Sequence, residues 1–518
     1  MNTLTNRRDF IQTGTGLLAT ISSPATAADS SRIEIDPAPA FDLSPHLYMQ
    51  FMEPLGTTDS SVEAAWDHDA KDWRADVVAA TADLAPTMMR WGGIFTDYYR
   101  WREGVGPRNR RVPMRNILWG GYESNQVGTA EFVDFSRRVG ADPLVCVNFE
   151  SDGRPNFMEV DGSRRVGDAR EAAEWVAYCN DPDNAERKGH GFAAPLRVPY
   201  WQIGNETSYA RQGFDLNTAK RKTVEFARAM RQADPSIKLI GWGGRDWRQR
   251  ELGDKAPQWA KGMIEAAGDL LDYVAFHHMF NPDSAEEPVL AFGKFRQDPA
   301  RSWDQLMGAW KAHDEKIRWA REQVAGTAMP LAMTECHYAI PGRHRCEVLS
   351  TWACGVSYAR LLNLHERHGD VLKIATAADF CGTRWQVNAV MIPVPKSAGR
   401  AFLMPVAHVM RLYRKHTGAQ ALKVFRSPDG LDVTASRTGE KIFLHVANAN
   451  RTRGVSAVIS VPGRALSGGK AWEIAADPML EILGNDPGVL APKEKAVPPD
   501  GRWTFPPASV TALEVGLT

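Results

Sequence analysis

The sequence has no excess of either charge. Its 518 residues include 62 basic and 62 acidic side chains, so the formal net charge is zero. Nucleic acids and anionic membranes bind basic surfaces, and this balance argues against either as a partner. Beyond the first 30 residues no apolar run is long enough to span a bilayer. The sequence also has no internal repeat and no low-complexity tract, which argues against solenoid and propeller architectures.

Cysteine is scarce as well. Most of the cysteines lie in apolar runs without a spacing that indicates pairing. They are Cys146, Cys179, Cys336, Cys346, Cys354 and Cys381. This predicts mainly buried free thiols, which suits a protein that folds in a reducing compartment. A disulfide between Cys346 and Cys354 stays open from the sequence.

Residues 1–30 are predicted to be a twin-arginine signal segment. Asn6–Ile11 carries the two arginines, a weakly apolar run follows over residues 11–23, and Ala25–Ala27 offers small residues for cleavage. We therefore expect export by the twin-arginine route and a periplasmic or extracellular location.

About 490 residues remain, too many for one hydrophobic core, which predicts two domains. Residues 43–404 alternate strand and helix patterns eight times, and Thr129–Val139 and Thr218–Ala233 are two of the helices. This alternation predicts an α/β fold, a (β/α)8 TIM barrel. The strand candidates are His46–Phe51, Thr87–Trp91, Pro143–Phe149, Val198–Glu206, Ile237–Gly243, Tyr273–Met279, Leu331–His337 and Lys373–Phe380.

Residues 405–518 carry short strand patterns separated by Pro, Gly, Asp and Asn. This predicts a C-terminal antiparallel β-sandwich, like a jelly roll. Residues 31–42 are a candidate for one further strand of that sandwich.

Two predicted strands of the barrel each deliver a glutamate. Arg197–Glu206 is an aromatic, apolar stretch that ends in Asn205-Glu206, and Leu331–Tyr338 contains Glu335. A single glutamate at a strand end is commonly a helix cap or a salt-bridge partner. The pair lies about 130 residues apart, which is about three βα units, so Glu206 falls on the fourth strand and Glu335 on the seventh. Strand alternation would point Asn205 and Glu206 to opposite faces, unless a bulge ends the strand.

Side chains at the carboxyl ends of barrel strands form the active site. Two carboxyl groups there suit acid/base and nucleophilic work on a glycosidic bond. Glu53 follows the first predicted strand, Arg90 and Trp91 end the second, His277 lies near the end of the sixth and Gln386 follows the eighth. Arg90 or His277 would stabilise an ionised nucleophile, and Trp91 is predicted to contact substrate.

Taken together, these motifs resemble those of the family 51 glycoside hydrolases, the α-L-arabinofuranosidases of the large retaining barrel clan. The resemblance runs from about residue 46 to the C-terminus. It is strongest in Gly128–Asn148, Glu171–Asn180, Tyr200–Glu206, Asp234–Gly241 and His368–Val390. It implies Glu206 as the general acid/base and Glu335 as the nucleophile of a double displacement. It also implies that Asn205 contacts the sugar 2-hydroxyl and that Glu53 and Gln386 hold substrate hydroxyls.

Three departures from the family pattern bear on specificity. Pro54 stands where the family usually has His, Gly92–Ile94 lacks the substrate-contacting Asn, and His278–Phe280 replaces a region that usually holds Tyr. The first hypothesis is an exo-acting α-L-arabinofuranosidase on side chains of plant polysaccharides. A β-xylosidase, an endoglucanase or a galactofuranosidase stays open, as does a non-catalytic sugar-binding protein on the same scaffold. The family often forms hexamers, so a homo-oligomer also stays open.

No cofactor and no metal is expected. His277, His278, His337 and His344 are accompanied by no HExxH motif and no Cys/His ligand spacing. The expected partner is an oligo- or polysaccharide substrate.

Overall fold

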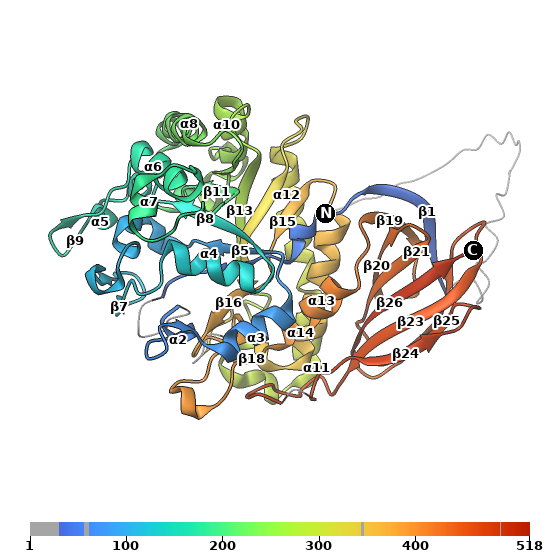
Figure 1. Ribbon diagram of the computed structural model, residues 1–518. Coiled ribbons are helices and arrows are strands. Elements are labelled where there is room, and N and C mark those ends of the chain that lie inside the picture. The colour runs from blue at the N-terminus through green and yellow to red at the C-terminus, as the bar shows by residue number, and fades with distance from the viewer. Residues whose placement is uncertain (1–30, 56–61, 343–345, 487) are drawn as a thin grey trace, which may run out of the picture.

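The computed structural model describes residues 31–55, 62–342, 346–486 and 488–518, arranged around two large sheets (Figure 1). The predicted signal segment lies outside these residues. The first sheet has eleven strands in the order β15-β14-β13-β12-β11-β8-β5-β2-β16-β17-β18. The second has nine, in the order β24-β23-β26-β21-β20-β19-β1-β22-β25. The predicted α/β barrel with a C-terminal antiparallel sandwich is confirmed.

Seven parallel strands form the continuous part of the barrel. They are β2 (Gln50–Met52), β5 (Met88–Trp91), β8 (Asp142–Val147), β11 (Tyr200–Ile203), β12 (Lys238–Trp242), β13 (Tyr273–Phe280) and β14 (Leu331–Tyr338). Most of their residues are buried, because helices cover the outside and side chains fill the inside.

The eighth predicted strand is two strands, and together they close the barrel. β15 (Leu372–Ala375) pairs with β14, whereas β16 (Asp379–Gly382) pairs with β2. The backbone N–H of Met49 donates to Ala375 O at 2.9 Å, which links the start of β2 to β15. The sequence pattern predicted one strand over Lys373–Phe380, because residues 376–378 between the two strands are also buried and include two alanines.

Helices lie between the strands and cover the barrel (Figure 1). The longer ones are α3 (Ala75–Leu84), α4 (Thr129–Arg138), α6 (Ala169–Asn180), α8 (Leu216–Ala233), α10 (Trp259–Ala267), α11 (Pro299–Gly308), α12 (Trp310–Gln323), α13 (Trp352–Arg367) and α14 (Pro405–Lys415). Shorter elements are α2 (Val62–Ala65), α5 (Pro155–Met158), α7 (Ala185–Gly189), α9 (Gln249–Leu252), β17 (Asn388–Met391) and β18 (Phe402–Leu403).

One of the two expected helices starts where predicted and the other does not. Helix α4 begins at Thr129 as predicted, and the N–H of its N-cap, Gly128, donates to the Glu131 side chain at 3.0 Å. Helix α8 begins two residues before the predicted Thr218, because the Asp215 side chain accepts a hydrogen bond from the Thr218 N–H. A side-chain cap fixes where a helix starts more firmly than hydrophobic periodicity does.

The second sheet forms the C-terminal part of the molecule. Its strands are β19 (Gln420–Arg426), β20 (Leu431–Thr438), β21 (Lys441–Asn448), β22 (Val455–Ser460), β23 (Leu466–Ala475), β24 (Lys493–Val497), β25 (Arg502–Phe505) and β26 (Ser509–Leu517). β1 (Arg32–Asp42) joins them, antiparallel to β19 and parallel to β22. Inward-facing residues such as Ile33, Leu444 and Leu513 build a core separate from that of the barrel.

Helix α13 joins the two parts. The Trp352 indole donates to Ala508 O at 2.6 Å, and Glu366 accepts hydrogen bonds from Tyr48 and Thr434 while His445 lies 2.8 Å away.

All six cysteines are free and buried, so the predicted free thiols are confirmed and Cys346 and Cys354 do not pair. Among the described residues, no helix combines the length and the apolar character needed to cross a membrane.

Candidate active site

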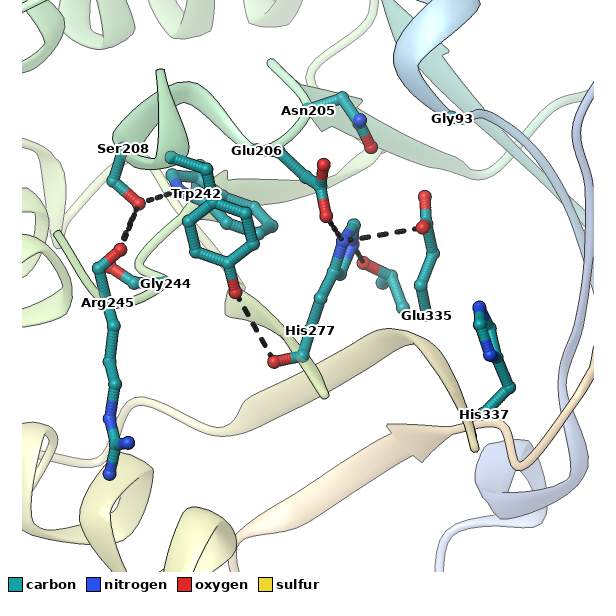
Figure 2. Close-up of polar contacts among 12 residues, drawn as sticks. Gly93, Asn205, Glu206, Ser208, Trp242, Gly244, Arg245, His277, Glu335 and His337 are labelled. Atoms are coloured by element: carbon teal, nitrogen blue, oxygen red, sulfur yellow. Dashed lines mark hydrogen bonds and ion pairs between the residues drawn. The ribbon is translucent and has the colours of Figure 1, made fainter. Parts of the chain in front are cut away.

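The predicted catalytic residues meet at the carboxyl ends of the barrel strands. Glu335 lies on β14 and His277 on β13, whereas Glu206 follows β11. Figure 2 shows the Glu206 and Glu335 carboxyl groups on either side of the His277 imidazole. In a (β/α)8 barrel this rim is where catalytic groups gather.

A tight turn brings both Asn205 and Glu206 to the site. Strand β11 ends at Ile203, Gly204 has φ +76°, and Glu206 has φ +56° in the left-handed region. The chain therefore leaves the strand before the two residues, and strand alternation no longer separates them. A bulge at the end of the strand was expected here, and a turn after the strand performs that role instead.

Buried polar groups hold this turn. Asp152 accepts hydrogen bonds from the Asn205 N–H, at 3.3 Å, and from the Thr207 hydroxyl. The Arg154 guanidinium donates to Glu206 O at 2.7 Å. A left-handed conformation is costly for a glutamate, so the surrounding structure has to impose it.

A bulge does occur on β14. Phe276 pairs with Met333, but the next residue, His277, pairs with Glu335, which leaves Thr334 as the extra residue. The Thr334 hydroxyl lies 2.9 Å from His277 Nε2. The bulge thereby turns the Glu335 side chain into the site. The Thr334 hydroxyl holds the His277 ring at its Nε2 atom.

The two carboxyl groups are close enough to share one reaction. A carboxylate oxygen of Glu206, one of Glu335 and a ring nitrogen of His277 all lie within 4.8 Å of one another. His277 Nδ1 is 3.0 Å from Glu206 Oε1 and 3.6 Å from Glu335 Oε2. Retaining glycosidases hold their carboxyl groups about 5–5.5 Å apart and inverting ones about 6.5–9.5 Å. The observed spacing suits retention.

The Arg90 side chain holds three oxygen acceptors at the base of the site. Its side chain is fully buried and donates to Glu335 Oε1 at 2.8 Å, to Asn205 Oδ1 at 2.6 Å and to Gln202 Oε1 at 3.0 Å. A planar guanidinium can hold three oxygens in one fixed arrangement, which a lysine cannot. Arg90 therefore positions both the proposed nucleophile and the asparagine beside the acid/base.

The electrostatic surroundings of the two glutamates favour a different protonation state for each. Burial raises the pKa of Glu206, and Arg154 and Arg90 only partly oppose this effect. Burial also raises the pKa of Glu335, but Glu335 accepts a direct hydrogen bond from Arg90, which favours its ionised form. Burial lowers the pKa of His277 to about 3, so this imidazole is neutral. The site is thus arranged for a protonated Glu206 and a carboxylate at Glu335.

A pocket of about 580 Å³ opens beside the two glutamates. The Trp119 and Trp385 rings line it and meet edge to face, with centroids 5.2 Å apart. The Trp119 indole donates to Glu53 Oε1 at 3.1 Å. Burial and the negative charge of Glu335 raise the pKa of Glu53 well above its usual range. Aromatic faces beside hydrogen-bonding groups are what a sugar ring requires.

Two of the predicted substrate contacts lie elsewhere. Trp91 is 3% exposed and packs on Phe95, Tyr99 and Phe132 towards α4, so it is a core residue and does not line the pocket. Its neighbour Arg90 points inward, and strand alternation therefore sends Trp91 outward. Gln386 lies between Trp385 and Val387, which line the pocket, but is not itself a lining residue.

The sequence pattern did not single out Asp379, Trp119 or His337 as substrate contacts, although all three line the pocket. His337 Nε2 lies 3.6 Å from Asp379 Oδ1. A charged residue inside a predicted buried strand was the signal available for Asp379. Trp119 lies in a loop next to two glycines, and no local pattern shows that this loop folds over the barrel mouth.

The ligand atoms of Glu206, His277 and Glu335 are also close enough together to hold a metal ion. The Arg90 guanidinium already bonds Glu335 at 2.8 Å, and a second cation beside it would be repelled. The donor set therefore fits acid/base work better than metal binding.

Comparison with known protein families gives one matching family model. An "Alpha-L-arabinofuranosidase 1 domain" matches residues 80–297, a stretch that includes Arg90, Glu206 and His277 but ends before Glu335. An intracellular exo-alpha-(1->5)-L-arabinofuranosidase of Halalkalibacterium halodurans is 30% identical over 46% of this chain and 45% of its own length. One from Streptomyces lividans is 28% identical over 86% of this chain and 66% of its own length. The matches thus span from under half to about two thirds of these relatives.

Solved structures share the fold. The family 51 arabinofuranosidase from Xanthomonas axonopodis pv. citri superimposes with a TM-score of 0.76 at 21% identity, covering 94% of this chain and 100% of that one. An α-L-arabinofuranosidase from Thermotoga maritima, solved with arabinose, gives 0.71 at 22% identity over 94% of this chain and 100% of that one.

The predicted export is contradicted by these comparisons. The relatives from Halalkalibacterium halodurans, Streptomyces lividans and Acetivibrio thermocellus are all named intracellular enzymes. The prediction of a periplasmic or extracellular location is therefore wrong. The prediction rested on a short Arg-Arg pattern before a Gly- and Thr-rich run. Because that run is only weakly hydrophobic, it does not distinguish a signal peptide from another kind of N-terminal segment.

Proposed function

With the resemblance to the family 51 glycoside hydrolases confirmed, we propose that the protein is a retaining glycoside hydrolase, an exo-acting α-L-arabinofuranosidase. The observation that carries this proposal is the approach of the Glu206 and Glu335 carboxyl groups to within 4.8 Å of each other at the mouth of the barrel. The names of the curated relatives support both the sugar and the exo mode of cleavage. Residues 43–404, together with α14 (Pro405–Lys415), would form the catalytic domain, and the strands of the second sheet, with residues 31–42, would form the sandwich.

In the first step the Glu335 carboxylate attacks the anomeric carbon while Glu206 donates its proton to the glycosidic oxygen. The bond between carbon and glycosidic oxygen breaks, the aglycone leaves as an alcohol, and the sugar stays attached to Glu335 as an ester. Arg90 holds the Glu335 carboxylate at 2.8 Å and keeps it from turning away. The neutral imidazole of His277 separates the two glutamates without adding charge.

In the second step a water molecule attacks the same carbon from the side the aglycone left. Glu206, now ionised, takes the proton of this water, and the ester bond to Glu335 breaks. Two inversions give overall retention of the anomeric configuration. Asn205 lies beside Glu206, held by Arg90, where it would contact the sugar 2-hydroxyl. Glu53, which lines the pocket, is the proposed contact to another hydroxyl.

A sibling specificity is a second candidate, because two apolar side chains line the pocket near positions where the family has polar ones. Ile94 follows Gly92-Gly93, where the asparagine is missing, and Met279 lies near the usual tyrosine. Each lost hydrogen bond to a substrate hydroxyl costs about 1–3 kcal/mol. That is enough to redirect the site to a xylose, glucose or galactofuranose unit.

Hydrolysis of a panel of 4-nitrophenyl glycosides by the purified protein tests both candidates. The α-L-arabinofuranoside should be cleaved fastest, and proton NMR should show a first product with the anomeric configuration of the substrate. Preference for another sugar would favour the sibling specificity, and inversion would contradict the mechanism. No hydrolysis of any glycoside in the panel would favour a sugar-binding protein instead.

A further inference from the structure

A second pocket, of about 660 Å³, opens on the same rim of the barrel. Met279 lines both this pocket and the one beside the two glutamates. The second pocket is bounded by residues that follow β11 and β12, by the end of β13 and by the first turns of α12. A chain of sugar units with one unit in the first pocket could therefore place a neighbouring unit in the second.

Lys316 is a buried cation at the wall of the second pocket. Its side chain is 6% exposed, and its Nζ lies 4.5 Å from the centroid of the Trp319 ring. In the part of the chain that the structure describes, Lys316 forms no ion pair with a carboxylate, and its contact is with the Trp319 ring. Burial and the charge of Arg245 lower the pKa of Lys316 to about 7. Burying an ammonium group without a carboxylate beside it is costly, which suggests that Lys316 is kept for a ligand.

Arg245 is the second cation. It follows β12, its guanidinium carbon lies 4.9 Å from the same Trp319 ring, and its Nε is buried without a hydrogen-bond partner among the described residues. In Figure 2 its side chain lies on the far side of His277 from Glu335. Arg245 and Lys316 thus both line the second pocket.

The acidic residues of this pocket do not neutralise the two cations. Asp246 accepts hydrogen bonds from Arg248, at 2.8 Å, and from the Trp259 indole, at 2.9 Å. Glu315 is exposed, and within the described residues it forms no ion pair with Arg245 or Lys316. An exposed third cation, Arg250, also lines the pocket.

Trp247 adds a flat aromatic surface to this pocket. It is 36% exposed, and its backbone N–H donates to Ser208 O at 3.0 Å, which fixes it to the turn after Glu206. The guanidinium carbons of Arg211 and Arg248 each lie 5.5 Å from its ring. An exposed indole is a surface on which a sugar ring stacks, and the flanking cations favour a ring that carries negative charge.

We propose that the second pocket is a subsite for a uronic acid unit next to the sugar that is cleaved. Lys316 and Arg245 would hold the uronate carboxylate, and the ring would lie against Trp247. This inference rests on the proposed glycosidase function and specifies its substrate as an acidic polysaccharide. Charge-assisted hydrogen bonds to a buried lysine and an arginine are strong enough to discriminate a carboxylate from its neutral ester.

Calorimetric titration with trigalacturonate and with its methyl ester, which lacks the negative charges, tests the subsite on the full chain. The acid should bind the unmodified protein about tenfold or more tightly than the ester. Lys316→Met and Arg245→Gln should each remove most of that preference. Lys311→Met, an exposed lysine on the same helix, is the matched control and should keep it.

Equal binding of acid and ester by the unmodified protein would overturn the subsite, as would full discrimination by Lys316→Met. Folding is checked by the melting temperature of Lys316→Met, which should equal or exceed that of the unmodified protein because methionine removes an unpaired buried charge. A lysine kept only for structure would lower it. The titration needs no turnover, so discrimination without any glycoside hydrolysis would contradict the proposed function alone.

Discussion

Arg90 Nη1 donates a 2.8 Å hydrogen bond to Glu335 Oε1, and the Arg90 side chain is fully buried. The contact joins β5 to β14, and four other strands lie between these two in the order of the sheet. It ties the proposed nucleophile to the same guanidinium that holds Asn205. One buried cation therefore sets the charge and the position of the groups on which the proposed reaction depends.

Replacement of Arg90 should cost both activity and stability. In Arg90→Met, Glu335 becomes a buried carboxyl without its cation, so we expect the free energy of unfolding to fall by about 3 kcal/mol and hydrolysis to be lost. Arg90→Lys keeps the charge but cannot bond three oxygens, so it should recover stability better than activity. Urea denaturation and aryl glycoside assays measure the two effects. Arg138→Met, a surface control, should change neither by much.

The two glutamates should fail in different ways. Glu335→Gln removes the nucleophile and should abolish hydrolysis of every substrate. Glu206→Gln removes the acid/base and should lower kcat by about 10²- to 10⁴-fold, least for a leaving group such as 4-nitrophenol that needs little protonation. Steady-state kinetics on an aryl and an alkyl arabinofuranoside distinguish the roles. The reverse pattern, with Glu206→Gln inactive on both substrates and Glu335→Gln active, would exchange the assignments.

The pH profile of kcat/KM should be bell-shaped. Activity requires Glu335 ionised and Glu206 protonated, so protonation of Glu335 sets the acidic limb and ionisation of Glu206 the alkaline limb. Because burial raises the pKa of Glu206, the alkaline limb should lie above the ordinary glutamate value of about 4.3. The profile of Glu206→Gln, measured on an aryl glycoside, should lose that limb. Retention of the limb would assign it to another group.

Thermal stability should show the same raised pKa. A carboxyl whose pKa is higher in the folded state binds its proton more tightly there, so its stabilising effect is complete below the unfolded value and fades as the pH rises through the folded one. At pH 7 Glu206→Gln, which cannot ionise, should therefore melt higher than the unmodified protein. The difference should shrink as the pH falls towards about 4. A difference that is constant with pH would mean that ionisation of Glu206 is not its cause.

Gly93 is required by the approach of Glu53. A Cβ at this residue would lie 2.2 Å from Glu53 Cδ, and its φ of +141° already disfavours other residues. Gly93→Ala should displace Glu53 and raise KM severalfold or more, on top of a backbone cost of about 1–3 kcal/mol. Gly140→Ala is the matched control, with φ +76° and nothing within 4 Å of the added Cβ. It should lose stability but keep KM, which kinetics and melting curves would show.

Local sequence patterns determined much of this fold. The alternation of apolar runs with helical periodicity placed seven barrel strands to within a few residues, and the change of pattern after residue 404 predicted the sandwich. Strand ends located Glu206 and Glu335, since a carboxylate that closes an apolar strand is visible in the sequence itself. These features depend on contacts between near neighbours, which is why a linear pattern carries them.

The tertiary structure alone decided which groups share a space. Arg90 and Trp91 are adjacent in the sequence, yet one enters the catalytic site and the other packs under α4. Lys316 and Arg245 meet at the same tryptophan from different elements. The barrel closes because β15 and β16 pair with strands at opposite ends of the row. Such approaches depend on how distant segments pack in three dimensions, and no local periodicity encodes them.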